Sequence, residues 1–245
     1  MAKKNRTRTD GVIDCACVIH SNGYDWQYVE KLYNMLTRAI PSGIRFHVYT
    51  EHDRSVPPHM IKHILDDWGL AGPKKSWWYK MQLFNPEHFS GNMLYLDLDV
   101  IVAKELDWVL TLPTDYLWAI RDFRYLQQRS TSTINSSVMW FNVEKFSWVW
   151  NDLQKKNVIE IARQFPGDQD YLSHVLKVDQ RRFFDDGYFE SYRWQCLDGG
   201  YDFARRVHKR PGAGVNIAPQ TSVVVFHGNP KPHQVHTPII QQLWQ

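Results

Sequence analysis

The apolar positions of the chain alternate between the spacing of strands and the spacing of helices. Mostly apolar runs at residues 12–19, 93–96 and 223–226 predict buried strands, and residues 44–49, 100–102, 116–120 and 137–142 predict further strands. Helical spacing occurs at residues 24–40, which end at Pro41, and helices are also predicted at 77–84 and 168–176. This alternation predicts an α/β fold with a mostly parallel central sheet. In such sheets, ligands bind beyond the carboxyl ends of the strands.

The composition narrows the class of protein. The 245 residues suit one large domain, which we expect over residues 11–245 after a disordered basic tail at residues 1–10. A formal net charge of +3 with 22% charged residues argues against a dedicated nucleic-acid binder. No apolar run is long enough for a transmembrane segment. The odd count of 3 cysteines and the absence of a secretory signal predict the cytoplasm, which could be that of a host cell.

Aromatic residues make up 14% of the chain. Most are expected in the core, and a minority in a cleft, where flat rings stack on sugars or nucleobases. For the pair Trp77-Trp78 the sequence leaves both interpretations open: core packing, or a platform for an acceptor.

The first chemical signal is a pair of aspartates at the end of an apolar strand. Asp97 and Asp99 follow residues 93–96 and precede a second apolar run at residues 100–102. Residues two apart in a strand point to the same face, so both carboxylates would be buried together. Burying two like charges is costly unless a cation offsets them, and Mg²⁺ or Mn²⁺ prefers such oxygen ligands. An acidic turn at a strand end is the alternative interpretation of this D-x-D pattern.

The second chemical signal follows the last predicted strand. His227 comes directly after residues 223–226, and Gly228, Lys231 and two prolines come next. A histidine there could offer an imidazole to the same metal, Gly228 would let the backbone approach a ligand, and Lys231 would place an ammonium near a phosphate. Taken alone, the segment equally suits a surface turn with a solvated lysine. Its pairing with the two aspartates favours a binding site.

Four motifs, in this order, resemble the retaining glycosyltransferases of family eight and their small viral and bacterial relatives. They are the apolar strand leading into D-x-D at Asp97, an Asn-rich strand segment at residues 134–139, an Asp-Gln pair opening a helix at Asp168, and the His, Gly and Lys-Pro at residues 227–232. The resemblance covers residues 12–232. It implies the GT-A fold, a Rossmann-like, single-domain α/β/α sandwich.

The resemblance also implies a role for each matching position. Asp97, Asp99 and His227 would hold Mn²⁺ or Mg²⁺, with Asp97 also near the donor ribose. Asn135, Asp168 and Gln169 would face the donor sugar and the reacting centre, and we place Asp170 with them; a plain helix N-cap is the alternative role for Asp168. The remaining donor-binding positions would be Lys80, Ser136, Gly228 and Lys231, together with Asn22, Tyr24, Thr50 and Asp53 in the strand-end loops around the nucleoside.

The sequence departs from the family pattern at two positions. The terminal motif of the family usually has two more residues between its histidine and its glycine, whereas His227 and Gly228 are adjacent here. Ser137 also follows Asn135-Ser136 where the family commonly has glycine.

These residues predict a metal-dependent transferase that moves a sugar from a nucleotide-sugar donor, expected to be UDP-linked, to a glycan or other hydroxyl acceptor. The metal and Lys231 would neutralise the diphosphate leaving group. Two alternatives remain. A nucleotidyltransferase acting on sugar phosphates would be expected to carry a Gly-rich basic loop, but residues 12–24 contain only Gly23 and no Lys or Arg. A non-catalytic carbohydrate-binding protein would have no need for a metal site.

Overall fold

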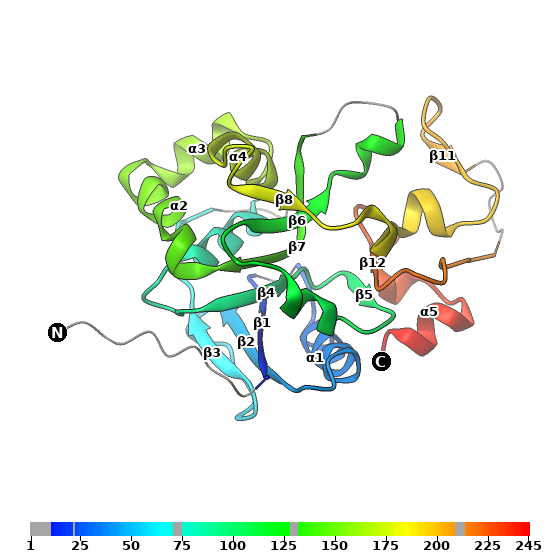
Figure 1. The fold of residues 1–245 in the computed structure, drawn as a ribbon, viewed down its shortest axis with the longest axis horizontal. Helices are drawn as coiled ribbons and strands as arrows, with labels where there is room; N and C mark the ends of the chain where they lie inside the picture. The colour runs from blue at the N-terminus through cyan, green and yellow to red at the C-terminus, as the bar shows by residue number, and fades with distance from the viewer. Residues whose placement is uncertain (1–10, 22, 71–74, 128–131, 209–213) are drawn as a thin grey trace.

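The structure, a computed structural model, describes residues 11–21, 23–70, 75–127, 132–208 and 214–245 (Figure 1). The predicted basic tail at residues 1–10 lies outside these ranges. The α-helices are α1 (Gln27–Ala39), α2 (Val143–Lys155), α3 (Val158–Gln164), α4 (Asp168–Val175) and α5 (Pro238–Leu243). The strands are β1 (Ile13–Val18), β2 (Ile44–Thr50), β3 (Ile61–Ile64), β4 (Asn92–Leu96), β5 (Val100–Val102), β6 (Leu117–Arg121), β7 (Ile134–Asn142), β8 (Arg181–Phe183), β9 (Phe189–Ser191), β10 (Tyr201–Asp202), β11 (Val207–His208) and β12 (Val223–Val225).

A seven-stranded sheet forms the centre of the molecule, with the strand order β3-β2-β1-β4-β7-β6-β8. Strands β3, β2, β1 and β4 run parallel, β7 is antiparallel to both of its neighbours, and β8 is parallel to β6. The predicted α/β class with a mostly parallel central sheet is therefore confirmed.

Helices cover both faces of this sheet because its central strands are apolar on both sides. In β1, Cys15 and Cys17 pack into the hydrophobic core that contains α1 and α5, whereas Ala16 packs into the opposite core, with α2 and α4. Figure 1 shows α2, α3 and α4 together on one side and α1 and α5 on the other. A long 3-10 helix, η1 (Ser76–Phe84), lies in the second core beside α2. The result is the α/β/α sandwich expected from the sequence.

A second, three-stranded sheet with the order β5-β12-β9 continues from β4. The chain leaves β4 at Leu96, turns through residues 97–99, and enters β5, which pairs antiparallel with β12. The register sets Val100 opposite Val225, and the Phe226 amide donates to the Asp99 carbonyl at 3.1 Å. The two predicted motifs, about 130 residues apart in the sequence, therefore meet where the two sheets join.

The differences from the predicted elements have physical causes. Residues 77–84 form η1 rather than an α-helix. Helix α2 was not predicted, although its buried Val143, Phe146, Val149 and Leu153 have helical spacing and Asn142 caps it. The predicted acidic N-cap at Asp168 is wrong: Gly167 is the N-cap of α4, and the Asp168 side chain bonds to Ser136 instead. Within the described residues, no helix combines the length and the apolar character needed to span a membrane.

Candidate functional site

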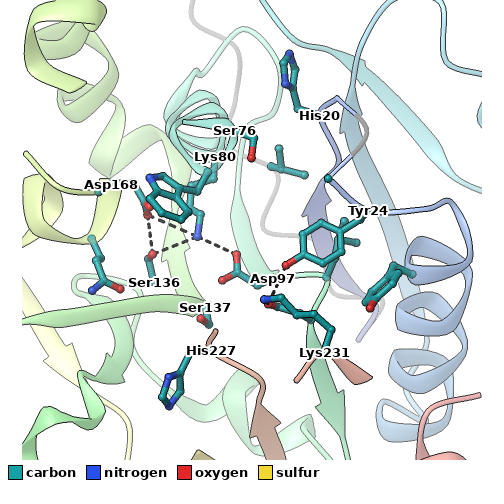
Figure 2. A pocket seen from close by; sticks show the side chains of 18 of the residues that line it. His20, Tyr24, Ser76, Lys80, Asp97, Ser136, Ser137, Asp168, His227 and Lys231 are labelled. Atoms are coloured by element: carbon teal, nitrogen blue, oxygen red, sulfur yellow. Dashed lines mark hydrogen bonds and ion pairs between the residues drawn. The ribbon is translucent and has the colours of Figure 1, made fainter. Parts of the chain in front are cut away.

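A cavity of about 800 Å³ opens at the carboxyl ends of β1 and β4 (Figure 2). Its size is within the range of small-molecule sites, and its place in the sheet is where α/β proteins bind ligands. Twelve of the residues predicted from sequence line it: Tyr24, Lys80, Asp97, Asp99, Asn135, Ser136, Asp168, Gln169, Asp170, His227, Gly228 and Lys231.

Three predicted donor-binding residues are not part of the described cavity wall. Asn22 lies outside the described residues. Thr50 is fully buried at the end of β2, where its hydroxyl donates to Glu51 at 2.9 Å, and Asp53 is exposed in the following loop. In this structure Thr50 and Asp53 are therefore not among the residues that line the cavity. Thr50 is enclosed by protein, and Asp53 is exposed to solvent.

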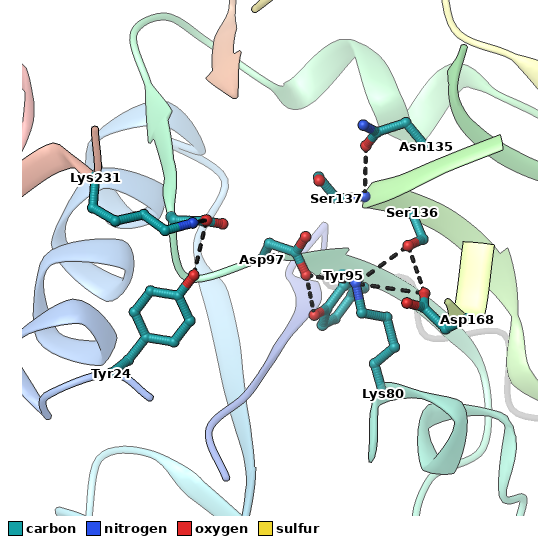
Figure 3. Close-up of polar contacts among 10 residues, drawn as sticks. Tyr24, Lys80, Tyr95, Asp97, Asn135, Ser136, Ser137, Asp168 and Lys231 are labelled. Carbon is teal, nitrogen blue, oxygen red and sulfur yellow. Dashed lines mark hydrogen bonds and ion pairs between the residues drawn. The ribbon is translucent and has the colours of Figure 1, made fainter. Parts of the chain in front are cut away.

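Asp97 is held by a buried lysine and a tyrosine from its own strand (Figure 3). Lys80 Nζ donates to Asp97 Oδ1 at 2.8 Å, and the Tyr95 hydroxyl donates to the same oxygen at 2.6 Å. The Tyr95 hydroxyl can reach the Asp97 carboxylate because residues two apart at a strand end point to the same side. Burial alone would raise the pKa of Asp97, but the Lys80 ammonium and the hydrogen bonds together hold it below its ordinary value.

The same lysine connects Asp97 to the buried carboxylate of Asp168. Lys80, only 4% exposed, lies 3.6 Å from Asp168 Oδ2 and donates to Ser136 Oγ at 3.2 Å. Ser136 in turn donates to Asp168 at 2.6 Å. Burial would lower the pKa of Lys80, but the charges of Asp168 and Asp97 outweigh it and raise that pKa. Burial raises the pKa of Asp168, although Lys80 opposes the shift.

An irregularity in β7 brings Ser136 to this position. Ala119 of β6 pairs with Met139, but the next residue, Ile120, pairs with Asn135, so the residues between are displaced from the β6 ladder. On the other side, Ser137 still accepts the Asp97 amide at 2.8 Å. Such bulges often re-aim side chains beside binding sites. Asn135 caps the bulge, since its side-chain oxygen accepts the Ser137 amide at 3.0 Å.

Asp99 has a separate set of partners at the other end of the turn. The Tyr24 hydroxyl donates to Asp99 Oδ2 at 2.8 Å, and Lys231 forms a salt bridge with the same oxygen (Figure 3). Burial and the neighbouring negative charge of Asp97 raise the pKa of Asp99, while Lys231 lowers it. Tyr24, predicted to border the nucleoside, is thus also a direct partner of an acidic residue.

The cavity wall carries more negative than positive charge. Among its described residues, five carboxylates face two ammonium groups: Asp25, Asp97, Asp99, Asp168 and Asp170 against Lys80 and Lys231. Like charges held together in a protected site repel and favour protonation of one member. The charge of Asp97 is, after burial, one of the causes that raise the pKa of Asp99. A divalent cation would relieve that repulsion.

His227 lines the cavity but bonds in another direction. Its Nε2 is 2.6 Å from Ser191 Oγ, and its ring stacks on Phe123 and meets Trp194 edge-on. Figure 2 shows the ring pointing away from Asp97. Burial, and then the positive charge of Arg193, lowers the pKa of His227 to about 4, so the imidazole is neutral at neutral pH. Within the described part of the chain, no three His, Cys, Asp or Glu side chains are grouped closely enough to hold a metal.

The remaining predicted residues form the rim of the site. Gln169 Nε2 donates weakly to Asp122 at 3.4 Å, and burial raises the pKa of Asp170. Gly228 has a φ of +76°, a conformation that favours glycine, and a Cβ added there would lie 3.7 Å from an Arg193 nitrogen. These positions lie at the edge of the cavity around Asp97, Asp99 and Asp168.

Sequence reasoning missed Tyr95, which lines the cavity, and Ser191, which is buried behind His227, and it left the Trp77-Trp78 pair undecided. Tyr95 could have been identified, because it lies two residues before Asp97 in the same strand. Ser191 gave no signal, because it meets His227 only in the folded chain. The Trp77-Trp78 pair is now resolved: Trp78 is 1% exposed in the core, whereas Trp77 is 40% exposed and lines the cavity.

Comparisons with known proteins bear on the fold. No protein-family model and no curated protein sequence matches the chain. Among solved structures, it is similar to the galactosyltransferase LgtC in complex with donor and acceptor sugar analogs, with a TM-score of 0.63 and 16% identity over 95% of this chain and 92% of that one. It is also similar to the glycosyltransferase GlyE of Streptococcus pneumoniae, with a TM-score of 0.60 and 17% identity over 95% of this chain and 59% of GlyE.

A third similar structure is mouse xyloside xylosyltransferase 1, with a TM-score of 0.51 and 15% identity over 88% of this chain and 98% of that one. At these identities the likeness shows the fold. The GT-A fold expected from the sequence motifs is confirmed.

Proposed function

We propose that this protein is a glycosyltransferase that moves a sugar from a nucleotide-sugar donor, UDP-linked, to a hydroxyl of a glycan or other acceptor. The observation that carries the proposal is the pair of a part-buried Asp97 and a buried Asp99 at the carboxyl end of β4, in the wall of a cavity of about 800 Å³. LgtC, of similar fold, is described in complex with donor and acceptor sugar analogs, which supports the same use of this cavity. We assign the activity to one domain, residues 11–245, acting in the cytoplasm, in keeping with its three free, buried cysteines.

A divalent cation, Mn²⁺ or Mg²⁺, fits the chemistry of the cavity wall. The excess of carboxylates over ammonium groups and the oxygen-rich pair at Asp97 and Asp99 suit such an ion. Mg²⁺ is commonly held by one or two carboxylates together with substrate phosphates and waters, so a donor diphosphate can complete the ligand set. For His227 to act as a third protein ligand, its Nε2 would have to exchange the Ser191 hydroxyl for the ion. Its neutral state favours that role.

The cation, when bound, stabilises negative charge on the departing diphosphate. Lys231 adds a second positive charge from the loop after β12, and it reaches the same place because it already bonds Asp99. Lys80 holds Asp97 and Asp168 in fixed positions through its ion pairs with both carboxylates. Asp168, Gln169, Asp170 and Asn135 face the remaining space, where the donor sugar and its anomeric carbon would lie.

Hydrolysis of a panel of nucleotide sugars and calorimetry with UDP test this proposal. The protein should hydrolyse at least one of a panel of UDP-, GDP- and CMP-sugars slowly in the absence of acceptor, and only with Mn²⁺ or Mg²⁺ present. Calorimetry should show that UDP binding is strengthened by Mn²⁺. A nucleotidyltransferase would instead release pyrophosphate from a nucleoside triphosphate and a sugar phosphate, and a carbohydrate-binding protein would bind sugars without UDP. UDP binding that is indifferent to the metal would refute the proposed mechanism.

A further inference from the structure

One large aromatic side chain is exposed in the wall of the cavity, and the reaction proposed above gives it no role. Among the described residues of this wall, Trp77 is the single large apolar side chain that is exposed, at 40%, while its neighbour Trp78 is buried in the core. An indole with an open face offers a large, rigid apolar surface on which a ligand ring can pack. Its position inside a cavity, rather than on the outer surface, favours a ligand.

The surroundings of Trp77 place it beside the carboxylates of α4. A Cβ added to Gly167 would lie 3.6 Å from the Trp77 indole Nε1 and 3.6 Å from Asp170 Oδ2. The indole and the Asp170 carboxylate therefore flank the same glycine, directly before Asp168. Because residue 167 has no side chain, the space between them stays open.

An indole face next to a carboxylate matches the two sides of a pyranose. The C–H face of a sugar ring packs on an aromatic face, and its hydroxyl groups donate hydrogen bonds to a carboxylate. On the proposed function, the donor diphosphate lies at Asp97, Asp99 and Lys231, and the nucleoside lies beyond Tyr24. Trp77 is on the Asp168 side of the cavity, away from the nucleobase and beside the space proposed for the donor sugar, where an acceptor ring has to approach the anomeric carbon.

We propose that Trp77 is the stacking platform of the acceptor subsite and restricts the acceptor to a pyranose ring, with Asp170 receiving its hydroxyls. This inference rests on the proposed glycosyl transfer. It names the substrate class of the acceptor, a glycan, in place of an unspecified hydroxyl compound.

The test separates binding of the donor from binding of the acceptor. Trp77→Ala should leave the Kd for UDP with Mn²⁺ and the acceptor-free hydrolysis of the donor unchanged. It should raise the KM for methyl β-glycosides of glucose, galactose and N-acetylglucosamine about ten-fold, with Trp77→Phe in between. Transfer to glycerol, which has no ring, should stay the same. Trp148→Ala is the matched control, since Trp148 is partly buried on α2 and does not line the cavity.

Binding without turnover gives a second readout. In a spectrum of the indole N–H groups of the 11 tryptophans, the Trp77 signal is assigned by its loss in Trp77→Phe, and it should shift on titration with the same methyl glycosides. The inference is overturned if no glycoside moves that signal, or if Trp77→Ala weakens UDP binding as much as transfer, which would make the indole a nucleobase platform. A wild-type protein that neither binds nor hydrolyses any nucleotide sugar would refute the proposed function instead, whatever the glycosides do.

Discussion

Replacing Lys80 with methionine removes one charge from the most enclosed part of the site. Lys80 Nζ lies 2.8 Å from Asp97 and 3.6 Å from Asp168, and its side chain is 5% exposed. Methionine keeps a similar length but leaves the buried Asp168 and the part-buried Asp97 without their shared ammonium. Breaking a buried ion pair in this way costs about 3–5 kcal/mol. That is a large part of the roughly 5–15 kcal/mol that stabilises a typical domain.

The loss should depend on pH, and its sign follows from the two carboxylates. In the wild type the pKa of Asp97 lies below its ordinary value, so its contribution is present at neutral pH and is lost as pH falls through that low pKa. Without the Lys80 ammonium, burial of Asp97 is opposed only by its remaining hydrogen bonds, so the pKa of Asp97 rises, and that of Asp168 rises further. The folded variant then binds protons that the unfolded chain releases, so lower pH stabilises it relative to the wild type.

Urea denaturation of both proteins at about pH 8 and about pH 5 measures this difference. The free energy of unfolding lost in Lys80→Met should be largest at the higher pH and shrink at the lower one. Lys156→Met serves as the control, because Lys156 pairs with Asp152 on the surface, where such a pair contributes about 0.5 kcal/mol or less. An equal loss at both pH values, or a loss no larger than that of the control, would show that Lys80 does not balance these carboxylates.

Three further predictions address the metal and its neighbours. Asp99→Asn should abolish the Mn²⁺-dependent tightening of UDP binding seen by calorimetry and leave the far-UV circular dichroism spectrum unchanged; unaltered Mn²⁺ dependence would remove Asp99 from the metal site. His227→Ala should weaken Mn²⁺ binding about ten-fold or more if the imidazole joins the ion, and Mn²⁺ affinity equal to wild type would restrict His227 to its bond with Ser191. Tyr24→Phe removes a hydrogen bond to the buried Asp99 and should lower the free energy of unfolding by about 1–3 kcal/mol in urea titrations; a change within error would contradict the bond.

The pattern of apolar residues was enough to predict the fold class. Residues 12–19 and 93–96 are apolar except for Asp14, and they form β1 and β4 because a parallel sheet covered on both faces buries both sides of each strand. Residues 44–49, in which Arg45 and His47 alternate with apolar residues, form β2. Short edge elements such as β3 and β8 escaped prediction, because they are half-exposed and carry no such run. Their pairing is decided by the neighbouring strand rather than by their own residues.

The sequence by itself indicated which side chains can do the chemistry, because charged residues next to apolar strands point to a binding site. These residues are Asp97, Asp99, Asp168, His227 and Lys231. It could not determine how those side chains pair. Lys80 bonds Asp97, Lys231 bonds Asp99, and His227 bonds Ser191, each across a long separation in the chain. Such contacts depend on how the two sheets meet and on the bulge in β7. The spacing of apolar residues in the sequence, every two residues in a strand or every 3.6 in a helix, describes only neighbours within one element. The tertiary structure therefore decided the partners, the excess of negative charge, and which tryptophan faces the cavity.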